Sequence, residues 1–138
     1  MGKAIAIDFG LKRSGIAITD DLQLFAFPHE TVDSHGLMVY LEVLVPKESV
    51  DTIVLGEPKR MDNSDTHITG NVRLLHEALV AKFPELNVVL MDERFTSKMA
   101  VQAMIAGGMK KKDRQVKGNI DKISAAIVLQ SYLSANNQ

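Results

Sequence analysis

Residues 4–18 read AIAIDFGLKRSGIAI, two short apolar runs joined by a loop that carries glycines and two cations. Such runs are typical of the strands of a buried hairpin. The first run ends near Asp8, and a carboxylate at the end of a core strand is costly to desolvate unless a metal, an amide or a cation partners it. Beside a cationic, glycine-flanked hairpin, the partner that we expect is a divalent metal ion that binds a phosphate. This stretch therefore predicts phosphate chemistry.

The size and composition of the chain predict a single globular domain over residues 1–138. The chain has 138 residues and is 46% hydrophobic, which is enough for a core without covalent cross-links. It contains no cysteine, which excludes disulfides, zinc–thiolate sites and thiol nucleophiles. The N-terminus lacks the pattern of a signal peptide, and no apolar run approaches the roughly 20 residues that span a bilayer. We therefore expect a cytoplasmic protein without a membrane segment.

The charge of the chain is nearly balanced. Its 16 basic and 17 acidic residues give a formal net charge of −1, whereas a protein that coats nucleic acid without specificity is strongly basic. Any nucleic-acid contact must then come from a local patch, and residues 110–117 provide one. A solvated surface loop is an equally valid interpretation of this run. Its five cations are Lys110, Lys111, Lys112, Arg114 and Lys117.

Apolar periodicity predicts three consecutive strands, followed by alternating helices and strands. Tight turns join the first three strands, which implies an antiparallel meander, and the later strands are short and fully apolar, as in a parallel sheet. The expected fold class is α/β, with a mixed five-stranded sheet of three antiparallel strands and then two parallel ones, flanked by helices. The expected strands are 4–8, 14–19, 22–32, 52–55 and 87–91, and the expected helices are 34–45 (stopped by Pro46), 68–83, 96–107 and a last one capped by Asn119.

Acidic residues follow the ends of the predicted strands. Ligands of open α/β sheets gather beyond the carboxyl ends of the parallel strands, where Asp8, Glu57 and the pair Asp92-Glu93 occur. Strand alternation turns one residue of that pair inward without deciding which, and Glu57 is either a further ligand or a solvated loop residue. Acids from two neighbouring strands and a crossing helix suit Mg²⁺ or Mn²⁺. Asp8, Glu93 and Asp121 fill these three places.

Cationic and amide side chains accompany the predicted acids. Lys12 and Arg13 lie beside Asp8 in the hairpin and are expected to hold a phosphate or the scissile strand. Residues that follow the later strands are expected to contact a nucleic-acid backbone, in contacts that position a substrate without reading its sequence. These are Lys59, Arg60, Asn63 and Arg94, together with the five cations of the 110–117 loop.

Two other function classes stay open from the residues alone. An Asp-x-Gly strand end before a glycine hairpin also opens the ATPase fold of actin and the sugar kinases, but those enzymes close two such domains around the nucleotide. A non-catalytic nucleic-acid-binding module would bind through residues 110–117 and use its acids for structure. In that case Asp8 would accept amide hydrogen bonds. Asp121, which is expected in the first turn of its helix, would interact favourably with the helix dipole.

The chain resembles the YqgF family of pre-16S rRNA nucleases, which are relatives of the Holliday-junction resolvases. The similarity runs in order over nearly the full length, through IDFGLKRSGIA (7–17), GEPKRMD (56–62), DERFTS (92–97) and DKISAA (121–126). The resemblance implies an RNase H-like fold, a bacterial cytoplasmic setting and a divalent-metal nuclease that matures the 5′ end of 16S rRNA. Ribosomal precursor particles are then expected partners, and the protein is expected to be a monomer or a homodimer.

The resemblance also implies roles for individual residues. The family's first-strand aspartate falls on Asp8, the acid of its Asp-Glu-Arg motif on Glu93, and its last-helix aspartate on Asp121. The chain departs from the family at Glu57, where leucine is common between the glycine and the proline. Two substrates stay open, precursor rRNA and branched DNA such as a Holliday junction.

Overall fold

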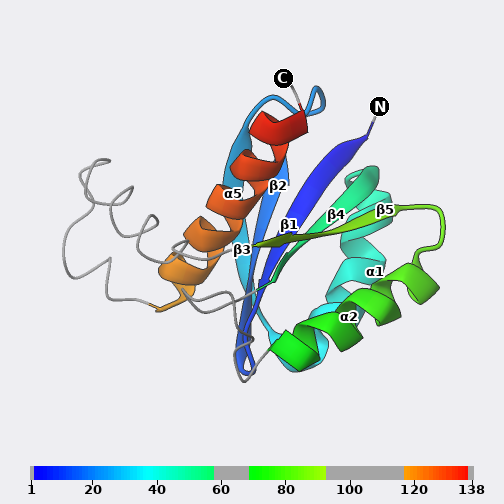
Figure 1. Ribbon diagram of the computed structural model, residues 1–138, viewed down its shortest axis with the longest axis vertical. Coiled ribbons are helices and arrows are strands. Elements are labelled where there is room, and N and C mark those ends of the chain that lie inside the picture. The colour runs from blue at the N-terminus through cyan, green and yellow to red at the C-terminus, as the bar shows by residue number, and fades with distance from the viewer. Residues whose placement is uncertain (1, 58–68, 93–116, 137–138) are drawn as a thin grey trace.

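The computed structural model describes residues 2–57, 69–92 and 117–136. Within these ranges the chain forms a five-stranded sheet with helices on both faces (Figure 1). No helix in the described ranges is both long and apolar enough to cross a membrane. The elements are β1 (Lys3–Phe9), β2 (Arg13–Thr19), β3 (Ala26–Asp33), η1 (Ser34–Gly36), α1 (Leu37–Lys47), β4 (Val50–Glu57), α2 (Thr69–Lys82), β5 (Asn87–Asp92) and α5 (Lys117–Asn136).

The strands form one mixed sheet in the order β3-β2-β1-β4-β5. β1 pairs with β2, and β2 with β3, in antiparallel fashion, whereas β1 with β4 and β4 with β5 are parallel. The helices α1 and α2 carry the chain back between the parallel strands, which hairpin turns could not do. The predicted five-stranded mixed sheet is confirmed. As a consequence, β1, β4 and β5 all end at the same edge of the sheet.

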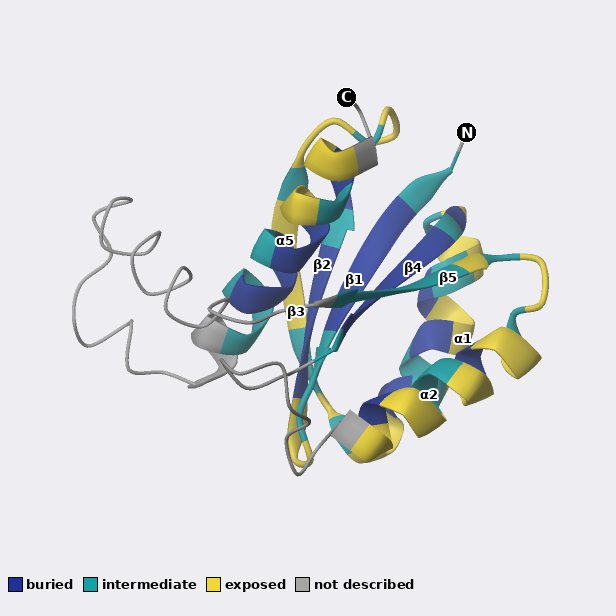
Figure 2. Ribbon diagram, in the orientation of Figure 1, coloured by how far each residue is buried: buried dark blue, intermediate teal, exposed yellow. Residues whose placement is uncertain are grey.

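The two faces of the sheet carry side chains of different size. Ile5 and Ile7 of β1 are fully buried on the face that α1 and α2 cover. Ala4 and Ala6 alternate with them and pack under α5 on the other face. Each buried isoleucine stabilises the fold by about 1.5–3 kcal/mol, while the small alanines let α5 lie close to the sheet. Figure 2 shows the buried side of α5 turned toward the strands.

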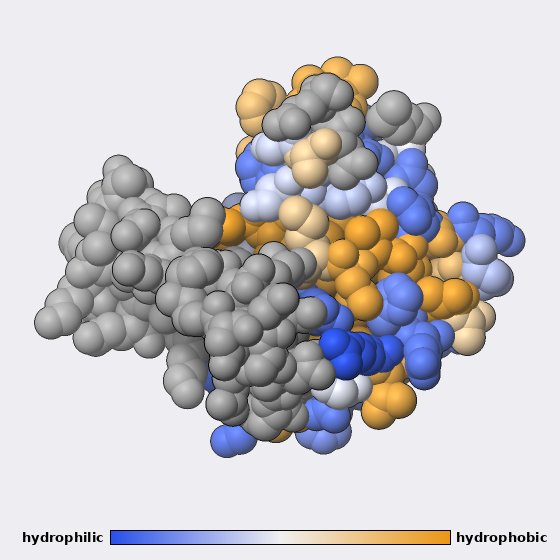
Figure 3. Space-filling view, in the orientation of Figure 1, coloured by the Kyte–Doolittle hydropathy of each residue, from blue (hydrophilic) through white to orange (hydrophobic). Residues whose placement is uncertain are grey.

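β5 is less buried than the central strands. Its residues 88–91 are all partly exposed, whereas Ile53, Val54 and Leu55 of β4 are completely buried. Figure 3 shows apolar surface over β5, between α5 and α2. The most buried part of the sheet is therefore formed by β1, β2 and β4. The strands β1 and β2 form the hairpin that contains Asp8.

Two predicted helix boundaries are wrong. The last helix, α5, begins at Lys117, so Asn119 lies inside it rather than at its N-cap, and Asp121 lies in its second turn rather than its first. Pro46 does not stop α1, which ends at Lys47. Pro46 lies in the last turn, so its missing N–H costs a hydrogen bond only at the end of the helix, which tolerates it. The helix expected over 96–107 lies outside the described residues.

The third strand also begins later than residue 22, at Ala26, because Asp20 closes a turn before it. The carboxylate of Asp20 accepts hydrogen bonds from the backbone amides of Leu24, at 2.8 Å, and Phe25, at 3.0 Å. The amide of Gln23 donates to the carbonyl of Asp20 at 3.0 Å. The amides of Phe25 and Leu24 hold the pKa of Asp20 below its usual range.

Replacing Asp20 by Ala is expected to lower the free energy of unfolding at neutral pH. The pKa of Asp20 is lower in the folded state than in the unfolded chain. Its stabilising contribution is therefore present above the unfolded pKa, about 4, and is lost as the pH falls through the folded pKa. Urea unfolding at about pH 7 and about pH 3 measures the effect. An equal difference between wild type and Asp20→Ala at both pH values would contradict the role given to this turn.

Candidate functional site

Asp8 lies near the carboxyl end of β1, on the face of the sheet that α5 covers. Ala4 and Ala6 pack under α5, and side chains alternate between the faces of a strand, so Asp8 shares their side. The ladder partner of Asp8 on β2 is Gly15. Directly opposed residues of an antiparallel pair also share a face. Asp8 is therefore adjacent to a position that carries no side chain.

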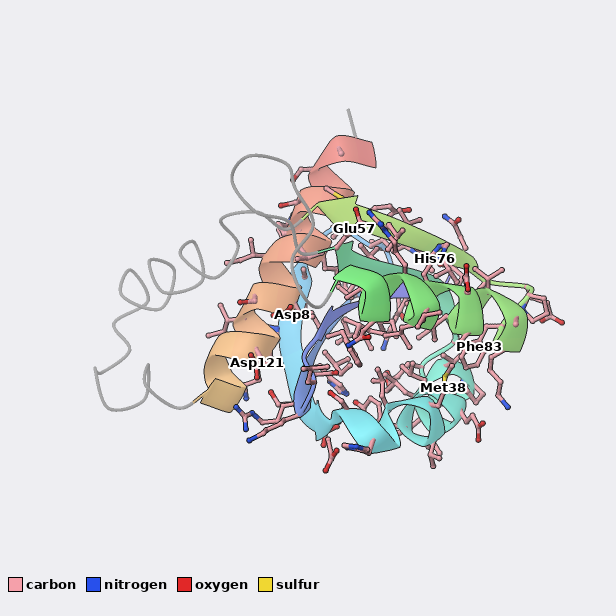
Figure 4. The ribbon with its side chains drawn as sticks, turned by 60° about the horizontal axis from the view of Figure 1, so that its bottom comes forward. Asp8, Met38, Glu57, His76, Phe83 and Asp121 are labelled. Carbon is pink, nitrogen blue, oxygen red and sulfur yellow. The ribbon has the colours of Figure 1, made fainter. Side chains whose placement is uncertain are left out.

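Gly15 is a point where the backbone of α5 closely approaches the sheet. A Cβ placed on Gly15 would overlap the backbone carbonyl of Asp121 and lie 2.6 Å from the backbone nitrogen of Lys122. Only glycine allows so close an approach. Because Gly15 pairs with Asp8 and touches Asp121, this contact brings together two acids from opposite ends of the chain. Figure 4 shows Asp8 and Asp121 as neighbours beside the first turns of α5.

Arg13 adds a cation to this pair of acids. Its Nε lies 3.6 Å from Oδ2 of Asp121, and the two side chains are 41% and 28% exposed, respectively. Arg13 is two residues before Gly15 on β2, and residues at this spacing point to the same face of a sheet. The face under α5 therefore carries two carboxylates and a guanidinium, all at the edge where β1 ends.

Hydrogen bonds to Ser34 hold the loop between β1 and β2. The hydroxyl of Ser34 donates to the carbonyl of Gly10 at 2.5 Å and shares a hydrogen bond with the hydroxyl of Ser14 at 2.7 Å. The backbone amide of Ser34 donates to the carbonyl of Lys12 at 3.0 Å. A Cβ on Gly10 would approach the carbonyl oxygen of Arg13 to 2.5 Å. The loop is thus tight and anchored, and it presents Lys12 to solvent.

Glu57, the last residue of β4, lies on the opposite face of the sheet from Asp8. Ile53 and Leu55 pack toward α1 and α2, and strand alternation puts Glu57 on their side. Its Oε2 lies 3.3 Å from Nε of Arg73 on α2, and its side chain is 13% exposed. Figure 4 shows Glu57 apart from Asp8 and Asp121. The structure therefore does not bring this acid together with the two aspartates.

The remaining predicted site residues lie at or beyond the limits of the described chain. Asp92 ends β5 and pairs in register with Glu57, and Lys117 begins α5. Among the described residues, no group of three His, Asp or Glu side chains could hold a metal ion. Glu93, the predicted third acid, is not among these described residues. Outside the described ranges lie Glu93, Lys59, Arg60, Asn63, Arg94, Lys110, Lys111, Lys112 and Arg114.

Sequence patterns did not identify three features of this site. They are the contact of Gly15 with α5, the pairing of Arg13 with Asp121, and the side chain of Ser124. Ser124 lies three residues after Asp121 on α5, and its buried hydroxyl has no hydrogen-bond partner within the described ranges. A glycine inside a predicted strand is a signal that could have indicated the close approach at Gly15. No local signal links Arg13 to a residue so distant in the sequence.

The mixed five-stranded sheet and its helices define a protein of the RNase H-like class. The chain is similar in structure to Thermus thermophilus RuvC in complex with a Holliday junction substrate, with a TM-score of 0.59, 16% identity, and 99% of this chain and 96% of that chain covered. A second Thermus thermophilus RuvC structure matches with a TM-score of 0.58, at 16% identity and with 98% and 96% covered. This likeness confirms the predicted RNase H-like fold.

The chain belongs to the RuvX family of Holliday junction resolvases, whose model it matches over residues 2–135. Two bacterial relatives carry the name "Putative pre-16S rRNA nuclease". The one from Phocaeicola vulgatus is 46% identical over 135 residues, covering 98% of this chain and 97% of the relative. The one from Christiangramia forsetii is 44% identical over 133 residues, covering 96% and 98%. The predicted family, also called YqgF, and the predicted class of phosphodiester hydrolase are confirmed.

Proposed function

We propose that this protein is a divalent-metal-dependent nuclease that hydrolyses phosphodiester bonds during processing of the 5′ end of precursor 16S rRNA. The observation that carries the proposal is the placement of Asp8 and Asp121 on one face of the sheet, held together by the contact at Gly15. The family and the names of the relatives support the same class of activity.

The donors at this place suit a divalent cation. Asp8 and Asp121 share a face, and Asp121 already attracts a cation, the guanidinium of Arg13. Carboxylate oxygens are the ligands that Mg²⁺ and Mn²⁺ prefer. We assign Asp8 and Asp121 to the metal, with Glu93 as the third ligand and Asp92 as the alternative in the same segment. A bound divalent cation supplies Lewis-acid stabilisation of the phosphate and an activated water.

The chain itself positions the acids and the substrate. The strand ladder and the contact at Gly15 hold the backbones of Asp8 and Asp121 in place, so the two carboxylates need little reorganisation before reaction. Lys12 protrudes from the anchored hairpin loop, where its ammonium group serves a backbone phosphate. We propose that further phosphate contacts come from Arg13, Lys59, Arg60, Asn63, Arg94, Lys110, Lys111, Lys112, Arg114 and Lys117.

Precursor 16S rRNA is the substrate that we favour, because relatives that share 44% and 46% of their residues with this chain are named for it. A four-way DNA junction is the second candidate, because the family model carries the description of a Holliday junction resolvase. We further propose a cytoplasmic setting, ribosomal precursor particles as partners, and a monomer or a homodimer as the working form.

Cleavage of a precursor 16S rRNA fragment tests this function. Purified protein is incubated with the 5′ fragment or with a four-way DNA junction, in Mn²⁺ or Mg²⁺, and the products are separated on a sequencing gel. We expect the RNA to be cut near its mature 5′ end and EDTA to abolish the cleavage, because the acids need a cation to act on a phosphate.

The other outcomes of this experiment would support a different function or mechanism. Cleavage of the junction with intact RNA would make the protein a resolvase. Binding of RNA without cleavage of either substrate would support the non-catalytic module. RNA cleavage that persists in EDTA would contradict the metal-dependent mechanism.

A further inference from the structure

We propose that Arg13 is a displaceable cation that occupies Asp121 until a divalent metal binds, and that it then moves to the phosphate backbone of the nucleic acid. The inference rests on the proposed function, because it concerns the same pair of acids. It assigns Arg13 two alternating partners and makes metal binding and substrate binding favour each other.

The geometry shows which of the two partners is fixed. The backbone of Asp121 is held by its contact with Gly15, which is the ladder partner of Asp8. Arg13 approaches the carboxylate of Asp121 with a long side chain that is 41% exposed, and its Nε lies 3.6 Å from Oδ2. An ion pair of this exposure and length is weak. Arg13 can therefore leave Asp121 without disturbing the fold.

A guanidinium and a divalent cation compete for the same carboxylate. Like charges a few ångströms apart repel each other, most strongly where water is partly excluded. We therefore expect metal binding at Asp8 and Asp121 to displace Arg13. The displaced guanidinium stays at the start of β2, next to Lys12 in the anchored loop. Two neighbouring cations then face the position of a backbone phosphate, and a guanidinium binds phosphate in a bidentate way.

The exchange of partners couples the two binding events. If a metal releases Arg13 for the phosphate, it raises the affinity for nucleic acid, and by linkage nucleic acid raises the affinity for the metal by the same factor. Without substrate, Arg13 lowers the affinity for free metal. With substrate, it adds a phosphate contact.

Arg73 provides a matched control for Arg13. It is also an arginine whose Nε pairs with a carboxylate, that of Glu57, at 3.3 Å and at the same edge of the sheet. The pair lies on the opposite face, toward α2. Replacing either arginine by Gln removes one charge and the described ion pair with a carboxylate, but only Arg13→Gln removes that pair from an acid of the proposed metal site.

The experiment titrates wild type, Arg13→Gln, Arg73→Gln and Asp8→Asn with Mn²⁺ in the absence of nucleic acid, and electron paramagnetic resonance measures free Mn²⁺. Circular dichroism checks that each variant is folded. We expect Arg13→Gln to bind Mn²⁺ about 2- to 5-fold more tightly than wild type, the range that the loss of one exposed ion pair corresponds to. Arg73→Gln should match wild type. In a second arm, Ca²⁺ should strengthen binding of a short RNA more in wild type than in Arg13→Gln.

The outcomes separate this inference from the proposed function. Equal or weaker Mn²⁺ binding by Arg13→Gln, with binding lost in Asp8→Asn, would overturn the role of Arg13 and leave the metal site standing. Tighter binding by Arg73→Gln alone would overturn the inference and move the site to Glu57. Unchanged Mn²⁺ binding by Asp8→Asn would contradict the proposed function itself.

Discussion

A Gly15→Val variant is expected to lose about 100-fold or more in cleavage rate and about 1–3 kcal/mol in the free energy of unfolding. A side chain at this position would overlap the backbone of Asp121, so α5 must move away from β2. Valine favours strands, so the loss cannot come from strand propensity. A displacement of about 1 Å is enough to misplace a catalytic acid. Urea unfolding and the RNA cleavage assay measure the two effects.

Gly70→Ala is the matched control for Gly15→Val. Gly70 lies on α2, is exposed, and a Cβ at this position would meet no atom of the described residues within 4 Å. Alanine is more favourable than glycine by up to about 1 kcal/mol in a helix interior, and Gly70 is the second residue of α2, so this variant should be at least as stable as wild type and equally active. A Gly15→Val protein with wild-type stability and activity would show that α5 does not depend on this contact.

An Asp8→Asn variant is expected to cleave precursor rRNA at least about 100-fold more slowly than wild type while keeping its affinity for RNA in the absence of metal. Loss of groups that only support a metal ligand costs about 10- to 100-fold, so loss of a ligand should cost no less. The amide has the size of the carboxylate, and the strand ladder around Asp8 is made by the backbone, so the fold should persist. Single-turnover cleavage and filter binding of RNA measure the two quantities.

Glu57→Gln separates Asp8 from acids that merely lie at the same edge of the sheet. Glu57 pairs with Arg73 on the α2 face, so its loss should change cleavage far less than Asp8→Asn does. If Glu57→Gln lowered the cleavage rate as much as Asp8→Asn does, our account would have assigned the reaction to the wrong face of the sheet. Unchanged cleavage by Asp8→Asn would remove the catalytic role of Asp8 altogether.

The parts of the fold with a clear sequence period could be predicted. Alternation and tight turns predicted the antiparallel meander, and short apolar runs predicted the parallel strands, because sheet burial leaves a direct trace in residue type. The position of Asp8 at a strand end followed from the same pattern. Leu37, Leu41 and Leu44 recur at helical spacing in the segment predicted as a helix, and all three are buried on α1.

Other features depended on contacts that no local pattern reports. The strand predicted over 52–55 continues to Glu57, and these two extra residues decide which face that acid occupies. Asn119 did not mark the start of α5, because asparagine, although favoured at N-caps, can also lie inside a helix. The pairing of Arg13 with Asp121 joins the first hairpin to the last helix, and it appears only when α5 packs on Gly15.

The position of a bound Mn²⁺ tests the central claim most directly. A crystal of the protein soaked in Mn²⁺ can be measured near the manganese absorption edge, where the ion gives an anomalous signal. We predict a peak within about 2.0–2.4 Å of a carboxylate oxygen of Asp8 and of one of Asp121, typical distances for a hard divalent cation. A peak at Glu57 and Arg73 instead, or no peak at Asp8 under conditions that support cleavage, would contradict the account.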